Sequence, residues 1–337
     1  MSSSSSLVIV VAGARGSLGK LVCDALLARA RMEGRAVLVR GLVRKGGDHV
    51  PSGSSESHPE SDSEQQLILE PVDYGNDDDL KRVCAGAQCV VSTLQGLEDV
   101  IVGVQSRLLE AAIANKVRRF IPTDYSIDFT GLPAGSNRNF DLRLQFHAAA
   151  DRIIQKSKSS IELTSIYQGA FTELLGTGWV VFDYQKRRIT YFGSPDTVAQ
   201  YTTWKNTAEF AAAVAMDPNP TPRSLFIAGQ RLSAKEAQQV AKRVTGIDFA
   251  LKRVMPIGML RGVIALMKTF KPGKKNEVMP LWVQMQYGYC MALGRSSPPH
   301  LDNDRYRGIQ WTGVDEVVRK AFDEAEASRS RQESPRA

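Results

Sequence analysis

The chain is poor in cysteine and has no long apolar run. Its four cysteines show no C-x-x-C spacing and no zinc-ligand pattern, so we expect reduced thiols and no metal site. No stretch reaches the roughly 18 consecutive apolar residues that span a membrane. The serine-rich start also lacks the charged region of a secretory signal. These absences predict a cytoplasmic protein without a membrane partner.

Acidic residues are fewer than basic residues, but the basic residues are dispersed along the chain. The 337 residues contain 43 Lys and Arg against 36 Asp and Glu, a formal net charge of +7. No arginine-aromatic interleaving accompanies these bases, so we expect no nucleic-acid partner. The excess favours solubility and attraction for phosphate-bearing ligands. The length suits one large α/β domain or one and a half, in a monomer or a homodimer.

The first thirty residues carry the strongest positive signal. Residues 7–12 are apolar and β-branched, which is typical of a buried strand, and residues 20–32 have apolar side chains at helical spacing. Glycines between them let the backbone approach a dinucleotide diphosphate, and N–H groups at the helix start point at the anion. The spacing is G-x-x-G-x-x-G, and the alternative is a tight turn that binds no ligand. The predicted cofactor contacts are Gly13, Arg15, Gly16, Ser17, Leu18 and Gly19.

The second apolar segment, residues 36–43, leads to Arg44 and indicates which cofactor binds. An NAD site usually has an acidic residue near this strand end to bind the ribose 2′-hydroxyl. No carboxylate occurs between Arg35 and Gly47. The guanidinium of Arg44 suits a 2′-phosphate instead. We therefore predict NADP(H) rather than NAD, and the alternative for Arg44 is a solvated strand end.

Strand and helix patterns alternate beyond this point, which predicts right-handed crossovers and an α/β fold with a doubly wound parallel sheet. We expect a cofactor-binding domain over residues 7–170, with a mobile polar loop at 46–66. Residues 171–325 would complete the sheet and form a smaller, mostly helical substrate domain. Residues 1–6 and 326–337 would be disordered tails. The further expected elements are strands at 67–72, 89–94, 119–123, 161–166 and 223–228, and helices at 76–84, 99–116, 139–156, 233–244, 257–270 and 281–293.

Ligands bind at the carboxyl ends of parallel strands, so the segments that follow these strands are expected to meet in one cleft. The Met-rich helices at 257–270 and 281–293 would form an apolar wall over it. The alternatives are plain core packing and, for residues 257–275, a helix on a membrane surface. The further predicted cofactor contacts are Thr93, Leu94, Gln95, Thr123, Asp124, Tyr167, Gly169 and Phe171.

Taken together, several segments resemble a known family. They are similar in order and spacing to the NmrA-like group of atypical short-chain dehydrogenases, to which isoflavone reductases also belong. The resemblance covers roughly residues 7 to 320. It implies a Rossmann domain, a small C-terminal substrate domain and NADP(H) binding, but not one function, because some members are reductases and others are sensors. The segments are 8–19, 42–44, 119–122, 140–143 and 169–171.

Within this resemblance the catalytic residues depart from the usual pattern. The Tyr-x-x-x-Lys spacing of ordinary short-chain dehydrogenases occurs at Tyr201 and Lys205, too late in the chain to face the nicotinamide. The plant reductases share a lysine on the helix after the fifth strand, a basic residue four positions on and an acid eight positions on. Here these positions are Arg143, His147 and Asp151, which steps of four place on one helical face. The alternative is a solvated face with ion pairs.

Arginine in place of lysine limits the chemistry. Arg143 cannot release a proton near neutral pH, since its pKa exceeds about 12, but it can polarise an acceptor carbonyl. The proton would come from His147, or from Asp124 or Tyr125. We predict that Arg143, His147 and Tyr125 catalyse reduction of a small apolar or aromatic carbonyl or enone by NADPH. The alternatives are a redox-sensing protein without turnover and an enzyme that keeps the cofactor for a cyclisation or isomerisation.

Overall fold

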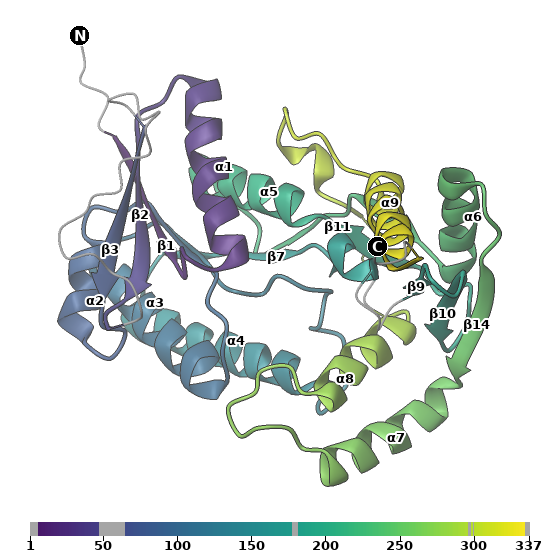
Figure 1. Cartoon of the computed structure of the whole chain (residues 1–337). Coiled ribbons are helices and arrows are strands. Elements are labelled where there is room, and N and C mark those ends of the chain that lie inside the picture. The colour runs from purple at the N-terminus through teal and green to yellow at the C-terminus, as the bar shows by residue number, and fades with distance from the viewer. Residues whose placement is uncertain (1–5, 47–64, 177–180, 296–297, 299, 334–337) are drawn as a thin grey trace.

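A six-stranded parallel sheet forms the centre of the N-terminal half (Figure 1). The computed structural model describes residues 6–46, 65–176, 181–295, 298 and 300–333. The strand order is β3-β2-β1-β4-β5-β6, so the order reverses between β1 and β4. In such sheets a crevice for ligands opens at this reversal, outside the carboxyl ends of the strands. The strands are β1 (Leu7–Ala12), β2 (Val37–Arg44), β3 (Gln65–Val72), β4 (Cys89–Ser92), β5 (Arg119–Ile121) and β6 (Glu162–Leu163).

Helices cover both faces of this sheet. Neighbouring residues of β1 point to opposite faces, so Ile9 and Val11 join one apolar core while Val10 and Ala12 join another. The first core lies under α1 (Ser17–Glu33) and α5 (Trp204–Met216). The second lies under α2 (Asp77–Cys84), α3 (Gln105–Ala114) and α4 (Arg138–Ser157). The prediction of a doubly wound α/β fold is confirmed.

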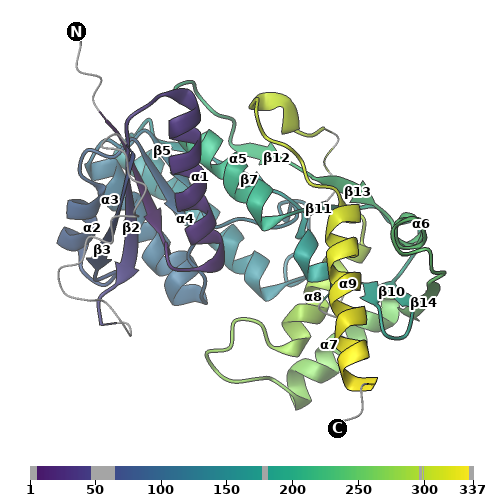
Figure 2. The same ribbon diagram turned by 45° about the horizontal axis from the view of Figure 1, so that its top comes forward.

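The helix α5 reaches the sheet late in the chain. It follows β7 (Ser165–Tyr167), β8 (Ala170–Phe171) and β11 (Ala199–Thr202), which belong to two smaller sheets outside the six-stranded one. Even so, α5 packs along α1, and both views show the two helices side by side (Figure 2). The chain therefore crosses between the two halves of the molecule more than once.

The C-terminal half contains short strands besides its helices. One three-stranded sheet has the order β14-β10-β9 and another has the order β13-β11-β8, while β12 pairs with β7. Four helices pack around these sheets. The elements are the 3-10 turns at Thr172–Gly176 and Asn303–Arg305, β9 (Val181–Asp183), β10 (Arg188–Phe192), β12 (Ser224–Phe226), β13 (Gln230–Leu232), β14 (Ala250–Met255), α6 (Ala234–Thr245), α7 (Ile257–Phe270), α8 (Leu281–Ala292) and α9 (Val314–Glu333).

Some expected boundaries need correction. The C-terminal tail does not begin at residue 326, because α9 continues through Glu333. The expected strand 161–166 divides at Thr164, where the next residue, Ser165, bonds to the Arg223 carbonyl and leaves the main sheet. The expected helix 99–116 opens with a π-helical segment, Asp99–Val104. Within the expected loop 46–66, Gln65 and Gln66 belong to β3, and residues 47–64 lie outside the described part, as do residues 1–5 of the N-terminal tail.

Two expected helix starts are confirmed. The Asn76 side chain caps α2 by accepting from the N–H groups of Asp78 and Asp79, and Ser233 with Glu236 forms a reciprocal capping box at α6. The N-cap of α5 is Thr203, whose hydroxyl oxygen accepts the Asn206 N–H.

A buried arginine fixes α5 to the sheet. The Arg119 side chain is 2% exposed, and its Nη2 lies 2.6 Å from Oε2 of Glu162 on the neighbouring strand. The guanidinium also donates to the carbonyls of Val214, Asp217 and Asn219 at the end of α5. The Val214 carbonyl is buried and would lose this donor if the arginine were removed.

We expect Arg119→Ala to lower the free energy of unfolding by about 3 kcal/mol, because it removes a buried side chain together with its ion pair and its hydrogen bonds to the end of α5. Urea unfolding followed by circular dichroism measures the effect. Arg118→Ala is the matched control, because Arg118 also binds carbonyls beyond α5 but its side chain is 39% exposed. Loss of the Arg118 side chain should lower the free energy of unfolding by at most about 1 kcal/mol. Equal losses in the two variants would contradict the assignment.

Candidate functional site

The loop between β1 and α1 is tightly packed around its glycines. Gly13 has φ +83°, and Gly16 donates its N–H to the Gly13 carbonyl at 2.9 Å. A Cβ on Gly13 would lie 2.9 Å from Oγ1 of Thr93, and a Cβ on Gly19 would overlap the Gly13 carbonyl oxygen. Only glycine fits these positions without moving the backbone.

The first turn of α1 is suited to an anion. Its N-cap is Gly16, which has no side chain to satisfy the first N–H groups, and the turn contains no acidic residue. Unsatisfied N–H groups and the helix dipole attract negative charge there. Arg15 and Ser17 are exposed at this turn, and Leu18 is half-buried. The residues present therefore fit a cofactor diphosphate.

The ends of β2 and β3 lie beside this loop. Arg44, the last residue of β2, is exposed. Tyr74, just after β3, is 8% exposed. Burial raises the pKa of Tyr74 to about 12. The Gly13 amide and the charge of Arg44 act in the opposite direction, because both groups lie near the phenol. Sequence reasoning missed Tyr74, because a lone tyrosine in an Asp- and Gly-rich turn matches no motif.

Two threonines join the carboxyl ends of the central strands. Thr93, after β4, donates its hydroxyl to the Ala12 carbonyl at 2.8 Å, and Thr123, after β5, donates to the Leu94 carbonyl at 2.8 Å. The buried amide oxygen of Gln105 accepts the Thr123 N–H at 3.0 Å, another contact that the sequence did not indicate. The glycine loop, Leu94 and Thr123 therefore lie together, as predicted, and Gln95 beside them is exposed.

Arg143 extends this group of residues onto α4. Its Nε donates to the Thr123 carbonyl at 2.9 Å, and its Nη1 donates to the Asn139 carbonyl at 3.1 Å. Within the described residues, Nη2 has no hydrogen-bond partner. The guanidinium is thus held at the end of β5 with donors remaining for a ligand.

His147 lies one turn further along α4 and faces inward. Its Nε2 is 2.6 Å from Oδ2 of Asp124, which also accepts from the Ser165 hydroxyl at 2.7 Å. Asp124 is fully buried, and its Oδ1 has no hydrogen-bond partner among the described residues. The Phe129 ring packs against the imidazole, with centroids 5.5 Å apart. The Asp124 carboxylate therefore points at His147 and not at solvent, and it orients the imidazole.

The expected row of residues on one face of α4 is divided. Asp151 lies on the surface and pairs with Arg223 at 2.9 Å. Because Arg143 and His147 bind groups at and beyond the end of β5, the three residues form neither a common cluster nor a set of mutual ion pairs.

The structure contradicts the assignment of Tyr125 as a proton donor. Its ring lies in the apolar core with residues of α5 such as Ala208, and its hydroxyl has no partner within the described chain. Burial raises the pKa of this phenol far above its usual range, and the nearby Cys89 and Asp124 raise it further. Beyond β5 the Asp124 side chain meets α4 while Tyr125 lies in the α1–α5 core, so the tyrosine is directed away from Arg143.

The segment 167–171 is fixed by packing and by backbone contacts. The Tyr167 ring is buried, stacked on Phe226 at 5.5 Å, so it is committed to the core of the C-terminal half. Gly169 has φ +80° and donates its N–H to the Ser126 carbonyl at 3.1 Å. Phe171 is half-buried, edge-on to Trp204 at 5.6 Å. Of the three predicted contacts, Tyr167 therefore offers the site only its main chain.

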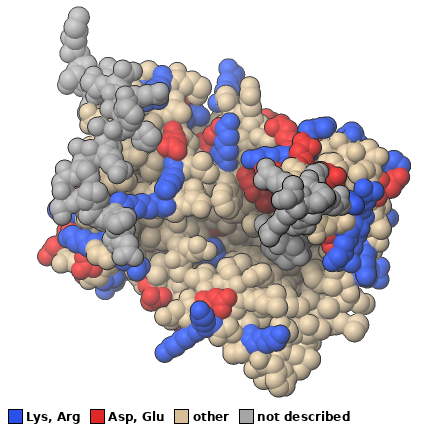
Figure 3. Space-filling view, in the orientation of Figure 1, with Lys and Arg blue, Asp and Glu red and all other residues tan. Residues whose placement is uncertain are grey.

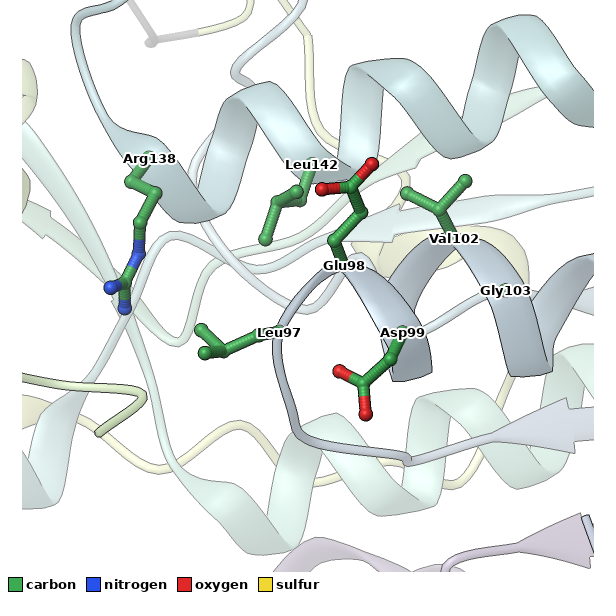
Figure 4. Close-up of a pocket in the computed structure, with 7 residues that line it drawn as sticks. All are labelled: Leu97, Glu98, Asp99, Val102, Gly103, Arg138 and Leu142. Atoms are coloured by element: carbon green, nitrogen blue, oxygen red, sulfur yellow. The ribbon is translucent and has the colours of Figure 1, made fainter. Parts of the chain in front are cut away.

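A hollow of about 770 Å³ lies beside α4 (Figure 4). It opens between the π-helical segment Asp99–Val104 and the first turns of α4, and Leu142 on its wall adjoins Arg143 in sequence. The space-filling view shows that the molecule is also hollowed at its centre, over largely uncharged residues (Figure 3). The sequence did not indicate the lining residues, which are Leu97, Glu98, Asp99, Val102, Gly103, Arg138 and Leu142.

Among the described residues, no group of His, Cys, Asp and Glu is arranged to hold a metal ion. In the same part of the chain, no helix combines the length and apolar character needed to cross a bilayer.

Comparison with protein families and curated proteins gives concordant matches. A family model described as NAD(P)H-binding matches residues 13–204. The chain is 26% identical to "Oxidoreductase swnN" of Arthroderma benhamiae over 191 residues, which are 52% of this chain and 58% of that protein. It is 23% identical to "Oxidoreductase swnN" of Metarhizium robertsii over 275 residues, 72% of this chain and 75% of that protein.

Solved structures share the fold at low identity. The structure of AtPrR2 with NADP⁺ and (+)pinoresinol superposes with a TM-score of 0.68 and 17% identity, covering 94% of this chain and 99% of that chain. Isoflavone reductase superposes with a TM-score of 0.70 and 15% identity, with coverage of 94% and 99%. The structural resemblance to isoflavone reductases that the sequence suggested is confirmed.

Proposed function

Because this chain belongs to the NAD(P)H-binding family, we propose that it is an NADP(H)-dependent reductase of a small apolar or aromatic carbonyl or enone. The observation that carries the proposal is the position of Arg143. Its guanidinium is held by the Thr123 carbonyl at the end of β5, and Thr123 is joined through Leu94 to the strand that ends beside the glycine loop. A cationic donor is thus fixed at the edge of the sheet where such folds hold their cofactor.

The glycine loop and its neighbours would hold the cofactor. The first-turn N–H groups of α1 bind the diphosphate, and Arg44 binds the 2′-phosphate of the adenosine half. The Tyr74 phenol lies near Gly13 of this loop. The predicted contacts Thr93, Leu94, Gln95, Thr123, Gly169 and Phe171 surround the remainder of the cofactor, whereas Asp124 contributes by holding His147.

When bound, NADPH supplies a hydride. Arg143 orients the acceptor oxygen with the donors that its two backbone contacts leave, and stabilises the negative charge that develops there. Because Arg143 keeps its proton near neutral pH, His147 supplies the proton to the substrate. The buried Asp124 carboxylate holds the imidazole in place at 2.6 Å. The curated relatives named oxidoreductases and the pinoresinol-bound relative support a redox reaction on a small organic substrate.

The test is NADPH oxidation by the purified chain against a panel of aromatic and aliphatic carbonyls and enones, followed by absorbance and by product analysis. Substrate-dependent oxidation with a matching reduced product is the expected result. Tight NADPH binding without oxidation by any member of the panel would overturn the proposal.

A redox sensor without turnover is the second candidate. Its support is that Tyr125 is buried and Arg143 cannot donate a proton, so His147 is left alone in that role. A sensor binds NADP⁺ and NADPH with unequal affinity, which calorimetry measures, whereas equal affinities together with turnover would exclude it. A cyclisation or isomerisation would instead form product with no change in NADPH absorbance.

We expect Arg44→Ala to weaken NADPH binding by about 10- to 100-fold and to leave NADH binding unchanged, because only NADPH carries the 2′-phosphate that the guanidinium binds. Fluorescence titration with both cofactors measures the change. Lys45→Ala is the matched control, because Lys45 is adjacent but pairs with Asp79 at 2.7 Å. An equal loss for NADH and NADPH in Arg44→Ala would contradict the assignment.

A further inference from the structure

The helix α7 presents an apolar stripe to solvent. Met259, Leu266 and Phe270 are 62%, 58% and 77% exposed. At 100° per residue these three positions fall on one side of the helix, with Val263 between them. Leu281, at the start of α8, is also exposed, at 52%. Large apolar side chains gathered on one surface mark an interaction site more often than isolated ones do.

The opposite side of α7 is firmly attached to the molecule. Leu260 and Ile264 are the buried residues of the helix, and α7 packs along α8. Lys268 lies over the Trp282 ring at 5.3 Å, and Arg138 of α4 lies over the same ring at 5.1 Å. Both ribbon views place α7 at the periphery, with α8 between it and the rest of the fold (Figures 1 and 2). The stripe therefore faces outward and not toward Arg143.

The chain around this stripe is strongly basic. Between residues 250 and 281 there are seven basic residues and one acid, Glu277. Oε2 of Glu277 accepts the Lys274 N–H at 3.0 Å, which ties the acid to its own turn. The space-filling view shows a largely uncharged expanse at the bottom of the molecule, over α7 and α8 (Figure 3). The basic residues, all exposed, are Lys252, Arg253, Arg261, Lys268, Lys271, Lys274 and Lys275.

We propose that α7 docks the protein on an anionic lipid surface. The stripe of Met259, Leu266 and Phe270 enters the boundary between headgroups and acyl chains, and the lysines at 271–275 meet the anionic headgroups. This is the interfacial mode of binding, in which the helix lies in the plane of the membrane and does not cross it. It departs from the expectation of no membrane partner and takes up the alternative that the sequence left open for residues 257–275.

Charge distinguishes this occupant from a second copy of the chain. Two copies meeting through α7 would bring their basic segments together, and like charges in an interface oppose association. The headgroups of an anionic bilayer instead complement the basic segment, and the apolar layer beneath them can accept the side chains of the stripe. The same charge argues for anionic lipid in particular, because a neutral surface offers the lysines no counter-charge.

The experiment is co-sedimentation of the full chain with vesicles of phosphatidylcholine, alone or mixed with phosphatidylserine. The expected result is binding to the mixed vesicles that weakens as salt is added. The double substitution Leu266→Glu and Phe270→Glu should lower binding by about tenfold or more. The triple substitution of Lys271, Lys274 and Lys275 with Gln should abolish the preference for anionic vesicles.

The matched control is Met32→Glu, because Met32 is 63% exposed and belongs to α1, a helix that lies far from α7 in both views. It should bind vesicles as the unchanged chain does. NADPH affinity should be the same in every variant, which shows that the fold is retained. Absence of binding to mixed vesicles, or equal binding by the Leu266/Phe270 variant, would overturn the proposal. So would a dimer in light scattering that this variant converts to monomer, because the occupant would then be a second copy.

Discussion

Replacing Gly19 with alanine is expected to weaken NADPH binding by on the order of 100-fold, a loss of about 2.7 kcal/mol. A methyl group at this position would overlap the Gly13 carbonyl oxygen and lie 2.8 Å from Oγ1 of Thr93. The backbone has to move to accommodate it, and that movement displaces the N–H groups that face the diphosphate. Calorimetric titration with NADPH measures the loss, with circular dichroism to verify folding.

Alanine substitutions at two further glycines are expected to have smaller effects on NADPH binding. Gly16→Ala places its methyl 3.2 Å from the same carbonyl oxygen, so we expect a smaller loss of about tenfold. Gly258→Ala is the control, because a methyl there meets nothing within 4 Å and α7 accepts alanine readily. If Gly19→Ala bound NADPH as tightly as the control, the glycine loop would not be the diphosphate site.

Removing the Arg143 side chain is expected to lower kcat by about 100-fold while changing the NADPH dissociation constant by no more than about threefold. In the proposed mechanism its guanidinium, which the Thr123 and Asn139 carbonyls hold in place, acts on the acceptor oxygen and not on the adenosine half. Steady-state kinetics with the best substrate of the panel, combined with cofactor titration, separates the two effects.

Other basic residues provide the comparison. Arg143→Lys keeps the charge but loses the planar fork, so it should retain an intermediate rate. Arg152→Ala, an exposed position on the same helix, should leave kcat unchanged. A loss of NADPH affinity equal to the loss of kcat in Arg143→Ala would reassign Arg143 to cofactor binding.

The cofactor half of the site was predictable because its geometry is local. A buried strand, a glycine loop and a helix follow one another within thirty residues, so spacing alone predicts a loop that suits a diphosphate. The alternation of strands and helices likewise determined the sheet and the common edge at which Thr93 and Thr123 meet. Tyr74 escaped notice because its proximity to Gly13 depends on how β3 lies two strands away from β1.

The catalytic half was harder to predict because side-chain direction depends on distant partners. Helical spacing places Arg143, His147 and Asp151 on one side of α4, but it does not say what each meets. His147 is drawn inward by the buried Asp124, whereas Asp151 is drawn outward by Arg223, far along the chain. Tyr125 follows Asp124 directly and yet joins the opposite core. No periodicity in one segment contains that information.

The late return of α5 to the main sheet makes the two halves of this protein interdependent. A fragment ending near residue 170 would lack the helix that covers Ile9 and Val11, and the exposed apolar face would promote aggregation. The N-terminal half is thus not a self-sufficient folding unit. Chimaeras that exchange substrate specificity between relatives have to carry the 204–216 segment with the cofactor half, even though it is encoded within the other.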